Sequence, residues 1–355
     1  MTASGTRQVV VLEDGSVALE EHPLAPLGPG DALVRFVLSG VCGSDVHAAH
    51  GRHPWVPRPY RPGHELVGIV EELGSAAGDG AGSSAGGARV RVGDRVAVEP
   101  IHACGDCKYC RDGRYNLCAT MAFFGCTTPL GGMADRFVLP AKLLIPLPAG
   151  LSDEEAALVE PLSTPVHAVN LAGGDLQGRT VAILGAGTIG LLVLAVVKAR
   201  GAAKVVVTDP LPTKRSLALE LGADEVFDAT DPGVVAAVRA SLGTSADIVF
   251  DCVAVQATMD QAIAMAIKGG TVVVVGVPSR PVTVPLPEIQ DLQIRIQGSA
   301  TYVRSDIETA IGMLAAHAVP ADRIVTAAYP LSRAGEAFAA ASDGSNVKVI
   351  VRAEG

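Results

Sequence analysis

Four cysteines between positions 104 and 118 have the side chains and the spacing of a metal site. They are Cys104, Cys107, Cys110 and Cys118, separated by two, two and seven residues. Four thiolates can surround one Zn²⁺ tetrahedrally at about 2.3 Å each, which leaves no ligand position open. The cluster therefore predicts a structural zinc site that organises a loop and does no chemistry. An iron–sulfur cluster or redox-active thiols are the alternatives, but nothing else in the sequence suggests electron transfer.

A second chemical signal is the glycine-rich segment Gly185-Ala-Gly187-Thr-Ile-Gly190. It follows an apolar predicted strand, Thr180–Leu184, and begins a predicted helix that runs to about Ala199. This context is typical of dinucleotide binding. Gly185 permits the tight turn, Gly187 lets the backbone approach a pyrophosphate, and Gly190 allows close packing of helix on sheet. The helix N-terminus would offer free N–H groups to the phosphates.

An acidic residue at the end of the next strand predicts which dinucleotide binds. Asp209 follows the predicted strand Lys204–Thr208 and can accept hydrogen bonds from both ribose hydroxyls. It would repel a 2′-phosphate, so NAD is favoured over NADP, although Lys214 and Arg215 could favour the phosphate or Lys214 could contact the ribose. An acid exposed to solvent at a strand end is the alternative for Asp209. The other predicted cofactor contacts are Thr164, Thr188, Ile189, Val253, Val275 and Val277.

The order of predicted elements indicates two domains. Strands alternate with helices over 159–302, and Ala246–Asp251 and Thr271–Val275 are further buried strands, which implies a parallel sheet. Residues 1–158 and 303–355 would form a mostly β domain that carries a zinc lobe at 102–120. Its predicted strands include Gln8–Leu12, Ala32–Ser39 and Leu66–Leu73. Residues 74–88 are nearly all Gly, Ala and Ser and predict a flexible excursion, after which 89–98 predict paired strands around a Gly-Asp turn.

Composition narrows the functional class. The 355 residues are 49% hydrophobic and 18% charged, and they carry a formal net charge of -9 with a pI near 5.4. This charge argues against a nucleic-acid binder, which needs basic surface. The longest apolar stretch, Ile189–Val197, is too short for a membrane span, and the N-terminus lacks a secretory signal, so we expect a cytoplasmic protein. Cys126 and Cys252 are predicted to be small buried residues and not ligands.

Several dispersed motifs resemble, in the same order, those of the zinc-containing medium-chain dehydrogenase/reductase family over essentially the whole chain. They are Cys42-Gly-Ser-Asp-Val-His47, Gly63-His-Glu65, the four-cysteine lobe, Glu160-Pro-Leu162, and the glycine motif followed by Asp209. The first and fourth look like the branch of sorbitol, threonine and 2,3-butanediol dehydrogenases. Taken singly, Cys42, His64, Glu65 and Glu160 would be weak signals, and only the resemblance joins them.

The resemblance implies a GroES-like catalytic domain, a Rossmann domain, two zinc ions per chain and NAD. Cys42, His64 and either Glu65 or Glu160 would hold the catalytic zinc. Ser44 would accept the proton of the substrate hydroxyl, and His47 would lie further along a relay to solvent, unless it is merely a surface histidine. The implied reaction is reversible oxidation of a small secondary alcohol, vicinal diol or polyol to the ketone.

One departure from the family pattern bears on the substrate. Sorbitol dehydrogenases carry an arginine before the tyrosine that matches Tyr302, whereas this chain has Thr301. The segment therefore looks closer to butanediol dehydrogenases. Oxidation of an amino alcohol, as by threonine dehydrogenase, is one alternative, and a zinc- and nucleotide-binding protein without turnover is another. We also expect a homodimer or homotetramer, with strands at Val272–Val277 and Val282–Pro285 continuing a sheet between subunits.

Overall fold

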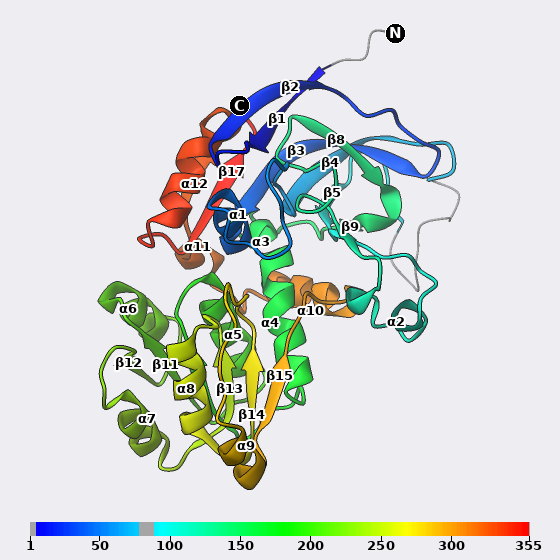
Figure 1. Cartoon of the computed structure of the whole chain (residues 1–355). Coiled ribbons are helices and arrows are strands. Elements are labelled where there is room, and N and C mark those ends of the chain that lie inside the picture. Colours follow the sequence, from blue (N-terminus) through cyan, green and yellow to red (C-terminus); the bar gives the residue numbers. More distant parts are fainter. Residues whose placement is uncertain (1–4, 78–88, 355) are drawn as a thin grey trace. The chain divides into compact units, whose positions relative to one another are not determined.

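The protein folds into two compact units (Figure 1). The computed structural model describes residues 5–77 and 89–354. Unit 1 comprises Met1–Pro161, Ile311–Ala316 and Ala321–Gly355, and unit 2 comprises Leu162–Ala310 and His317–Pro320. The boundaries expected from the sequence differ from this division: residues 159–161 group with unit 1, and residues 303–310 and 317–320 group with unit 2.

Unit 1 is built on a mixed sheet of seven strands, with the order β16-β17-β3-β4-β5-β9 and with β8 paired to β3. The two small ribbons beside this sheet are β1 paired with β2 and β6 paired with β7. The strands of unit 1 are β1 (Gly5–Val11), β2 (Val17–Pro23), β3 (Asp31–Val41), β4 (Glu65–Leu73), β5 (Arg95–Val98), β6 (Ile101–His102), β7 (Ala122–Phe123), β8 (Arg136–Pro140), β9 (Leu144–Pro146), β16 (Val325–Pro330) and β17 (Lys348–Arg352).

Strand β3 is the centre of this sheet because it pairs with β4, β8 and β17. Its alternate residues Val34, Phe36 and Leu38 are buried, as expected for a strand with one face on a core. The helices of unit 1 are α1 (Gly43–Ala49), α2 (Lys108–Arg111), η1 (Tyr115–Leu117), η2 (Ala141–Leu143), α3 (Asp153–Ala157), α11 (Ala321–Ile324), η3 (Leu331–Arg333) and α12 (Ala334–Ser342).

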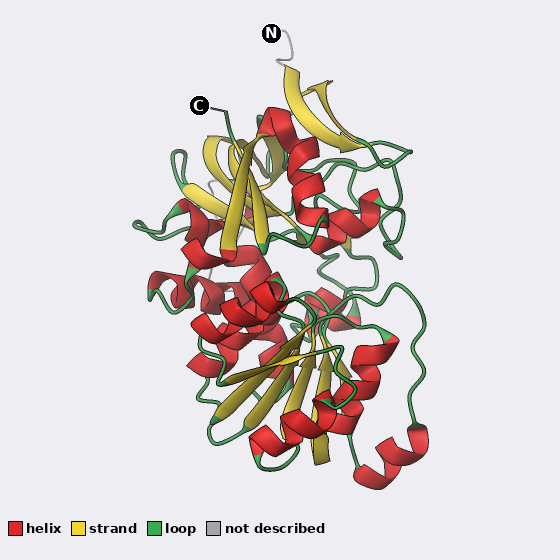
Figure 2. Ribbon diagram, turned by 90° about the vertical axis from the view of Figure 1, so that its left-hand side faces the viewer, coloured by secondary structure: helices red, strands yellow, loops and turns green. Residues whose placement is uncertain are grey.

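Unit 2 contains a parallel sheet with the order β12-β11-β10-β13-β14-β15, and Figure 2 shows helices packed on it. The order turns back between β10 and β13, which is the switch point where doubly wound folds bind nucleotides. The strands are β10 (Thr180–Leu184), β11 (Lys204–Asp209), β12 (Glu225–Asp228), β13 (Ala246–Asp251), β14 (Ala266–Val274) and β15 (Arg295–Gly298). The helices are α5 (Thr188–Ala199), α6 (Pro212–Glu220), α7 (Val234–Leu242), α8 (Gln256–Met265) and α9 (Leu286–Leu292), while α4 (Val159–Leu171) and α10 (Arg304–Ala315) contain residues of both units.

The predicted strands that begin at Thr180, Lys204, Ala246 and Thr271 are confirmed as parts of β10, β11, β13 and β14, whereas two other strand predictions are wrong. Residues 89–91 are irregular and only Arg95–Val98 form a strand there, because a turn at 92–93 ends the alternation. Val282–Pro285 is also irregular, since Pro281 precedes the segment and Pro285 ends it directly before α9. Of the predicted excursion, 74–77 form a turn against Pro29 and Asp31, and 78–88 lie outside the described residues.

The helices are short relative to the thickness of a bilayer. The longest, α4, has 13 residues. Within residues 5–77 and 89–354, no helix combines the length and the apolar character that a membrane span requires.

Candidate metal and dinucleotide sites

The four-cysteine lobe projects from the short ribbon in which Ile101 pairs with Phe123. Helix α2 begins after Cys107, so its first turn holds Cys110 near Cys104 and Cys107. The ligand sulfurs of Cys104, Cys107, Cys110 and Cys118 all lie within 4.8 Å of one another. Cys107 and Cys110 are 3.5 Å apart and Cys104 and Cys110 are 3.9 Å apart. Sulfurs around one tetrahedral Zn²⁺ would lie roughly 3.8 Å apart, so the lobe fits a closed zinc site.

Local hydrogen bonds favour a thiolate in this lobe. The backbone N–H groups of Asp106 and Cys107 lower the pKa of Cys104 to about 6. The N–H of Cys104 in turn points to the Sγ of Cys118 at 3.3 Å. Because zinc binds the thiolate form, this backbone arrangement suits a metal ligand better than a buried neutral thiol.

The second cluster is assembled by the register of the unit 1 sheet. Gly40 of β3 lies opposite Glu65 of β4, and Val41 lies opposite Val349 of β17. Cys42 follows the last residue of β3, and His64 precedes the first residue of the antiparallel strand β4, so the two lie at the same end of the sheet. Cys42, His64 and Glu65 each place a ligand atom within 4.8 Å of the others, and His64 and Glu65 are buried. One sulfur, one nitrogen and one carboxylate oxygen form a donor set that zinc accepts.

A buried ion pair accompanies this cluster. The Nζ of Lys348 lies 2.7 Å from both carboxylate oxygens of Glu65, and Lys348 is 3% exposed. Burial lowers the pKa of Lys348, but Glu65, Cys42 and Glu160 raise it, and the net pKa lies above the ordinary value. A Cβ at Gly40 would come 1.7 Å from a Glu65 oxygen, so only glycine leaves room for this carboxylate. Lys348 therefore compensates negative charge among the ligands.

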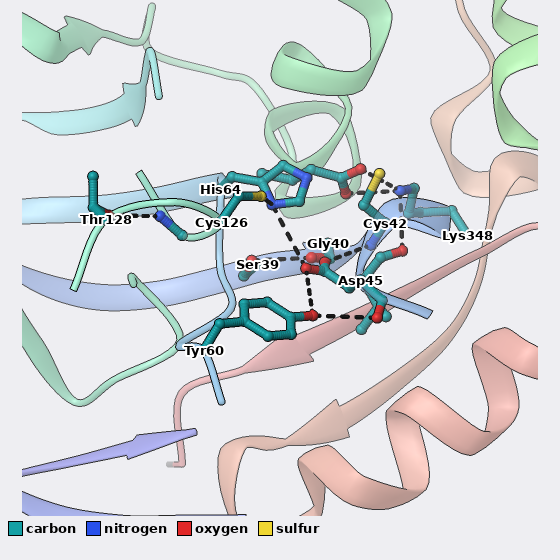
Figure 3. A network of polar contacts seen from close by, with 12 residues as sticks. Ser39, Gly40, Cys42, Asp45, Tyr60, His64, Cys126, Thr128 and Lys348 are labelled. Carbon is teal, nitrogen blue, oxygen red and sulfur yellow. Dashed lines mark hydrogen bonds and ion pairs between the residues drawn. The ribbon is translucent and has the colours of Figure 1, made fainter. Parts of the chain in front are cut away.

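The ring of His64 is fixed from its Nδ1 side (Figure 3). Nδ1 lies 3.5 Å from the Sγ of Cys126 and 3.8 Å from an oxygen of Asp45, while Phe123 packs edge-on at 5.6 Å. Asp45 is buried, which raises the pKa of its carboxyl, and its Oδ2 accepts a hydrogen bond from the N–H of Cys42 at 3.1 Å. Such contacts orient a histidine so that its other nitrogen can face a metal.

Close backbone packing brings Cys126 to this ring. Gly125 has a φ of 78°, and a Cβ there would meet the carbonyl oxygen of Gly63 at 2.2 Å. The sequence correctly indicated that Cys126 is buried, but it did not show this residue beside His64. It also did not single out Lys348. A single lysine in front of the apolar run Val349–Val351 is the signal that could have identified it.

The remaining predicted catalytic residues lie around this cluster. Glu160 is 8% exposed in the first turn of α4 and does not join the set within 4.8 Å, although its charge reaches Lys348. Ser44 and His47 lie three residues apart on α1, where Ser44 is half-buried and His47 is exposed. Partial desolvation, Arg52 and His50 lower the pKa of His47, so its imidazole is neutral at pH 7.

The glycine motif of unit 2 forms the turn that the sequence predicted. Gly185 has a φ of 95°, and a Cβ at Gly190 would meet the carbonyl oxygen of Gly185 at 1.8 Å. A Cβ at Gly187 would meet no atom within 4 Å among the described residues, so the backbone there borders open space. Gly187 is the N-cap of α5 and makes no side-chain cap, so the N-terminus of this helix begins at the glycine turn. This cradle fits a pyrophosphate.

Asp209 closes the same turn. Its Oδ2 accepts a hydrogen bond from the N–H of Ala186 and its Oδ1 accepts one from the N–H of Leu211, both at 2.8 Å. Lys214 on α6 is buried at 7% exposure. Asp209 thus joins the glycine turn to the end of β11.

The other predicted cofactor residues lie at strand ends of unit 2 and in α4. Val253, Val275 and Val277 follow the carboxyl ends of β13 and β14, and Val253 and Val277 are exposed apolar side chains. Thr164 is half-buried in α4. Cys252 lies beside Gly185 and is half-buried, whereas the sequence predicted a buried residue. Thr301 has a φ of 50°, and in the described part of the chain its buried hydroxyl has no hydrogen-bond partner, as also holds for Ser299.

Comparisons with known proteins place both units in one family. Residues 28–149 match the family model of the alcohol dehydrogenase GroES-like domain, and residues 188–316 match that of the zinc-binding dehydrogenase. Human sorbitol dehydrogenase is 36% identical over 353 residues, which cover 98% of this chain and 95% of that protein. The chain belongs to the zinc-containing medium-chain dehydrogenase family. It is a zinc- and NAD(P)-dependent dehydrogenase, and its predicted fold class is confirmed.

Two solved structures illustrate the similarity. A zinc-binding dehydrogenase from Sinorhizobium meliloti 1021, bound to NADP, is 32% identical with a TM-score of 0.88 and covers 98% of this chain and 99% of that one. The 2R,3R-butanediol dehydrogenase from Bacillus subtilis is 27% identical with a TM-score of 0.86 and covers 98% of this chain and 100% of that one. The fold is shared over the full length of these dehydrogenases.

Proposed function

We propose that this dehydrogenase oxidises a small secondary alcohol, vicinal diol or polyol to the ketone, reversibly and with NAD. The observation that carries the proposal is the buried cluster of Cys42, His64 and Glu65 beside Lys348. The similarity to human sorbitol dehydrogenase and to a butanediol dehydrogenase supports this substrate class. Thr301, in place of the arginine of sorbitol dehydrogenases, favours diols and secondary alcohols over long polyols.

The proposed zinc ligands are Cys42, His64 and either Glu65 or Glu160. When bound, zinc lowers the pKa of a coordinated alcohol so that it ionises near neutral pH. Lys348 holds both oxygens of Glu65 in the conformation described here. To bind zinc, Glu65 would have to turn one oxygen from Lys348 to the metal or contact both cations at once. Glu160 is therefore the second candidate for this ligand position. The four-cysteine lobe would hold the structural zinc.

We assign proton transfer to α1. Ser44 would accept the proton of the substrate hydroxyl, and His47 would pass it to solvent. The half-buried position of Ser44, the exposure of His47 and their spacing of three residues on one helix support this order. The lowered pKa of His47 keeps its imidazole able to accept a proton at pH 7.

NAD, when bound, accepts the hydride from the carbinol carbon. The turn Gly185–Gly190 would bind the pyrophosphate and Asp209 would bind the adenosine ribose. The buried carboxylate of Asp209 favours a free 2′-hydroxyl over a 2′-phosphate, because the negative charge of the carboxylate would repel the negative charge of a phosphate on the same ribose. We therefore propose a preference for NAD over NADP.

Oligomeric state and location are proposed on separate observations. Val284, Leu286 and Ile296 are exposed apolar side chains near the edge strand β15, which supports a homodimer or homotetramer. All seven cysteines are unpaired, which fits a reducing compartment such as the cytoplasm.

A substrate panel with metal analysis tests the proposal. Purified enzyme would be assayed for NADH formation with 2,3-butanediol, sorbitol, 2-propanol and threonine, and zinc would be measured on the same sample. We expect turnover with the diol or the secondary alcohol and about two zinc ions per chain. Turnover with threonine alone would instead favour amino-alcohol oxidation, and binding of NAD without turnover of any compound would contradict the proposed activity.

A further inference from the structure

An arginine that the proposed mechanism does not use lies between the ends of β11 and β12. The two strands are parallel, and their register pairs Asp209 with Asp228. Arg215, on α6, reaches back to both strand ends, and its side chain is only 18% exposed. A guanidinium is therefore held beside the residue proposed to bind the adenosine ribose.

The contacts of Arg215 direct it toward the backbone. Its Nη1 donates hydrogen bonds to the carbonyl oxygens of Asp209 at 2.7 Å and Pro210 at 2.9 Å. The same nitrogen lies 3.3 Å from the Oδ2 of Asp228. One end of the guanidinium is thus shared among two carbonyls and a carboxylate.

Hydrogen bonds from Thr230 orient the carboxylate of Asp228 toward Arg215. Its Oδ1 accepts hydrogen bonds from the Oγ1 and the N–H of Thr230, at 2.6 and 2.9 Å. Oδ2 is then left to face Arg215. The hydrogen bonds from Thr230 lower the pKa of Asp228, and Arg215 lowers it further, so the carboxylate is ionised at neutral pH.

This arrangement opposes a 2′-phosphate in two ways. Arginine binds phosphate through its planar fork of donors, and Nη1 of Arg215 is already engaged by two backbone carbonyls and by Asp228, so the guanidinium is held toward these groups and cannot use Nη1 for a phosphate. Asp228 also adds a second negative charge beside that of Asp209, which a phosphate dianion would have to approach.

We propose that Asp228 determines cofactor specificity by withholding Arg215 from a 2′-phosphate. The inference rests on the proposed NAD-linked function, and it assigns the choice of cofactor to a pair of residues in addition to Asp209. The ligand class it excludes is the 2′-phosphorylated adenine dinucleotide, and the class it admits carries a free 2′-hydroxyl.

Binding of two adenosine fragments to the full-length zinc-loaded enzyme tests this role without relying on turnover. Titration calorimetry would compare 5′-AMP with adenosine 2′,5′-bisphosphate for the wild type, Asp228→Asn and Asp228→Ala. We expect the dissociation constant of the bisphosphate to fall about 10-fold in both variants, which corresponds to about 1.4 kcal/mol. The constant for 5′-AMP should change less than about 2-fold, because the pyrophosphate cradle is untouched.

Two further variants separate Arg215 from net charge. Asp231→Ala removes the same charge three residues later, where the carboxylate accepts a hydrogen bond from the N–H of Gly233, and should leave the ratio of the two constants unchanged. In Asp228→Ala combined with Arg215→Ala, the gain should disappear. A gain that persists without Arg215, or that Asp231→Ala reproduces, would overturn the proposal.

An unchanged ratio in both Asp228 variants would also overturn it, provided that 5′-AMP still binds. If the wild-type enzyme prefers NAD, this result contradicts only the role of Asp228. A wild type that binds the bisphosphate more tightly than 5′-AMP would contradict both the proposed NAD preference and this inference, so the two failures can be told apart.

Discussion

The two metal clusters of unit 1 reach similar donor spacings in opposite ways. The ligands of the four-cysteine lobe lie within one loop, and three of its four cysteines remain at least partly exposed. The cluster of Cys42, His64 and Glu65 lies where the ends of separate strands meet, and it is mostly buried. Lys348, which lies near the C-terminus, forms an ion pair with Glu65 beside this cluster. A site that only holds a loop needs ligands alone, whereas a site that is to do chemistry also needs control of charge and orientation.

Removing the sulfur of the buried cluster should have the largest effect on activity. Cys42→Ser is expected to lower kcat by at least about 10³-fold, because the metal would be weakly held and misplaced. The dissociation constant of NADH should change little, since the dinucleotide turn lies in unit 2. Steady-state kinetics, NADH fluorescence and zinc analysis would check this. Full activity in this variant would remove Cys42 from the catalytic site.

Removing a sulfur of the exposed lobe should instead affect stability. Cys107→Ser is expected to lower the melting temperature and to release one zinc ion per chain, because metal binding contributes folding free energy. The kcat of the fraction that stays folded should remain within a few-fold of the wild type. Calorimetry and metal analysis on the same sample would measure both. An unchanged melting temperature with full zinc content would show that the lobe has no structural role.

Charge compensation distinguishes the buried cluster further. Lys348→Met leaves the carboxylate of Glu65 buried without its cation, and loss of one partner of a buried pair costs about 3–5 kcal/mol. The matched control is Lys198→Met, which removes a surface pair with Asp224 and should cost at most about 1 kcal/mol. Denaturant unfolding would compare them. Equal costs would mean that the Glu65–Lys348 pair is no more important than a surface pair.

The sign of the pH effect follows from the same lysine. The pKa of Lys348 is raised in the folded protein, so its stabilisation is complete below the unfolded pKa of about 10.5 and is lost as pH rises through the higher folded value. Wild-type stability should therefore decline more steeply than that of Lys348→Met in alkaline solution above about pH 10. Unfolding free energies of the two proteins from pH 8 to 11 would measure the difference.

The smallest expected effect concerns the second layer of contacts. Cys126→Ala removes the sulfur beside Nδ1 of His64 and should weaken zinc binding at the catalytic site about 10-fold, as loss of outer contacts commonly does. Cys252→Ala, in unit 2, serves as the control and should leave zinc affinity unchanged. Competition with a chelator would measure both. Equal zinc affinities in the two variants would show that Asp45 and Phe123 suffice to orient His64.

Local patterns in the sequence correctly predicted the structural features that depend on residues close together along the chain. The four cysteines, the turn Gly185–Gly190 and the strands of unit 2 each depend on neighbours within a few residues, so spacing and hydrophobicity predict them. The same local reasoning failed at 89–91, which a turn follows, and at 282–285, which lies between Pro281 and the start of α9. The catalytic ligands were joined only by family resemblance, because Cys42 and His64 are separated by a stretch that shows no period.

Only the tertiary structure decided what surrounds those ligands. The strand register set Lys348 beside Glu65, close packing of Gly63 and Gly125 set Cys126 beside His64, and the pairing of β11 with β12 set Arg215 between two aspartates. Each of these contacts joins residues whose separation along the chain carries no signal in a single sequence. The sequence shows which side chains can bind a metal. Strand pairing, a property of the whole fold, decides which cations and hydrogen-bond partners lie beside those side chains.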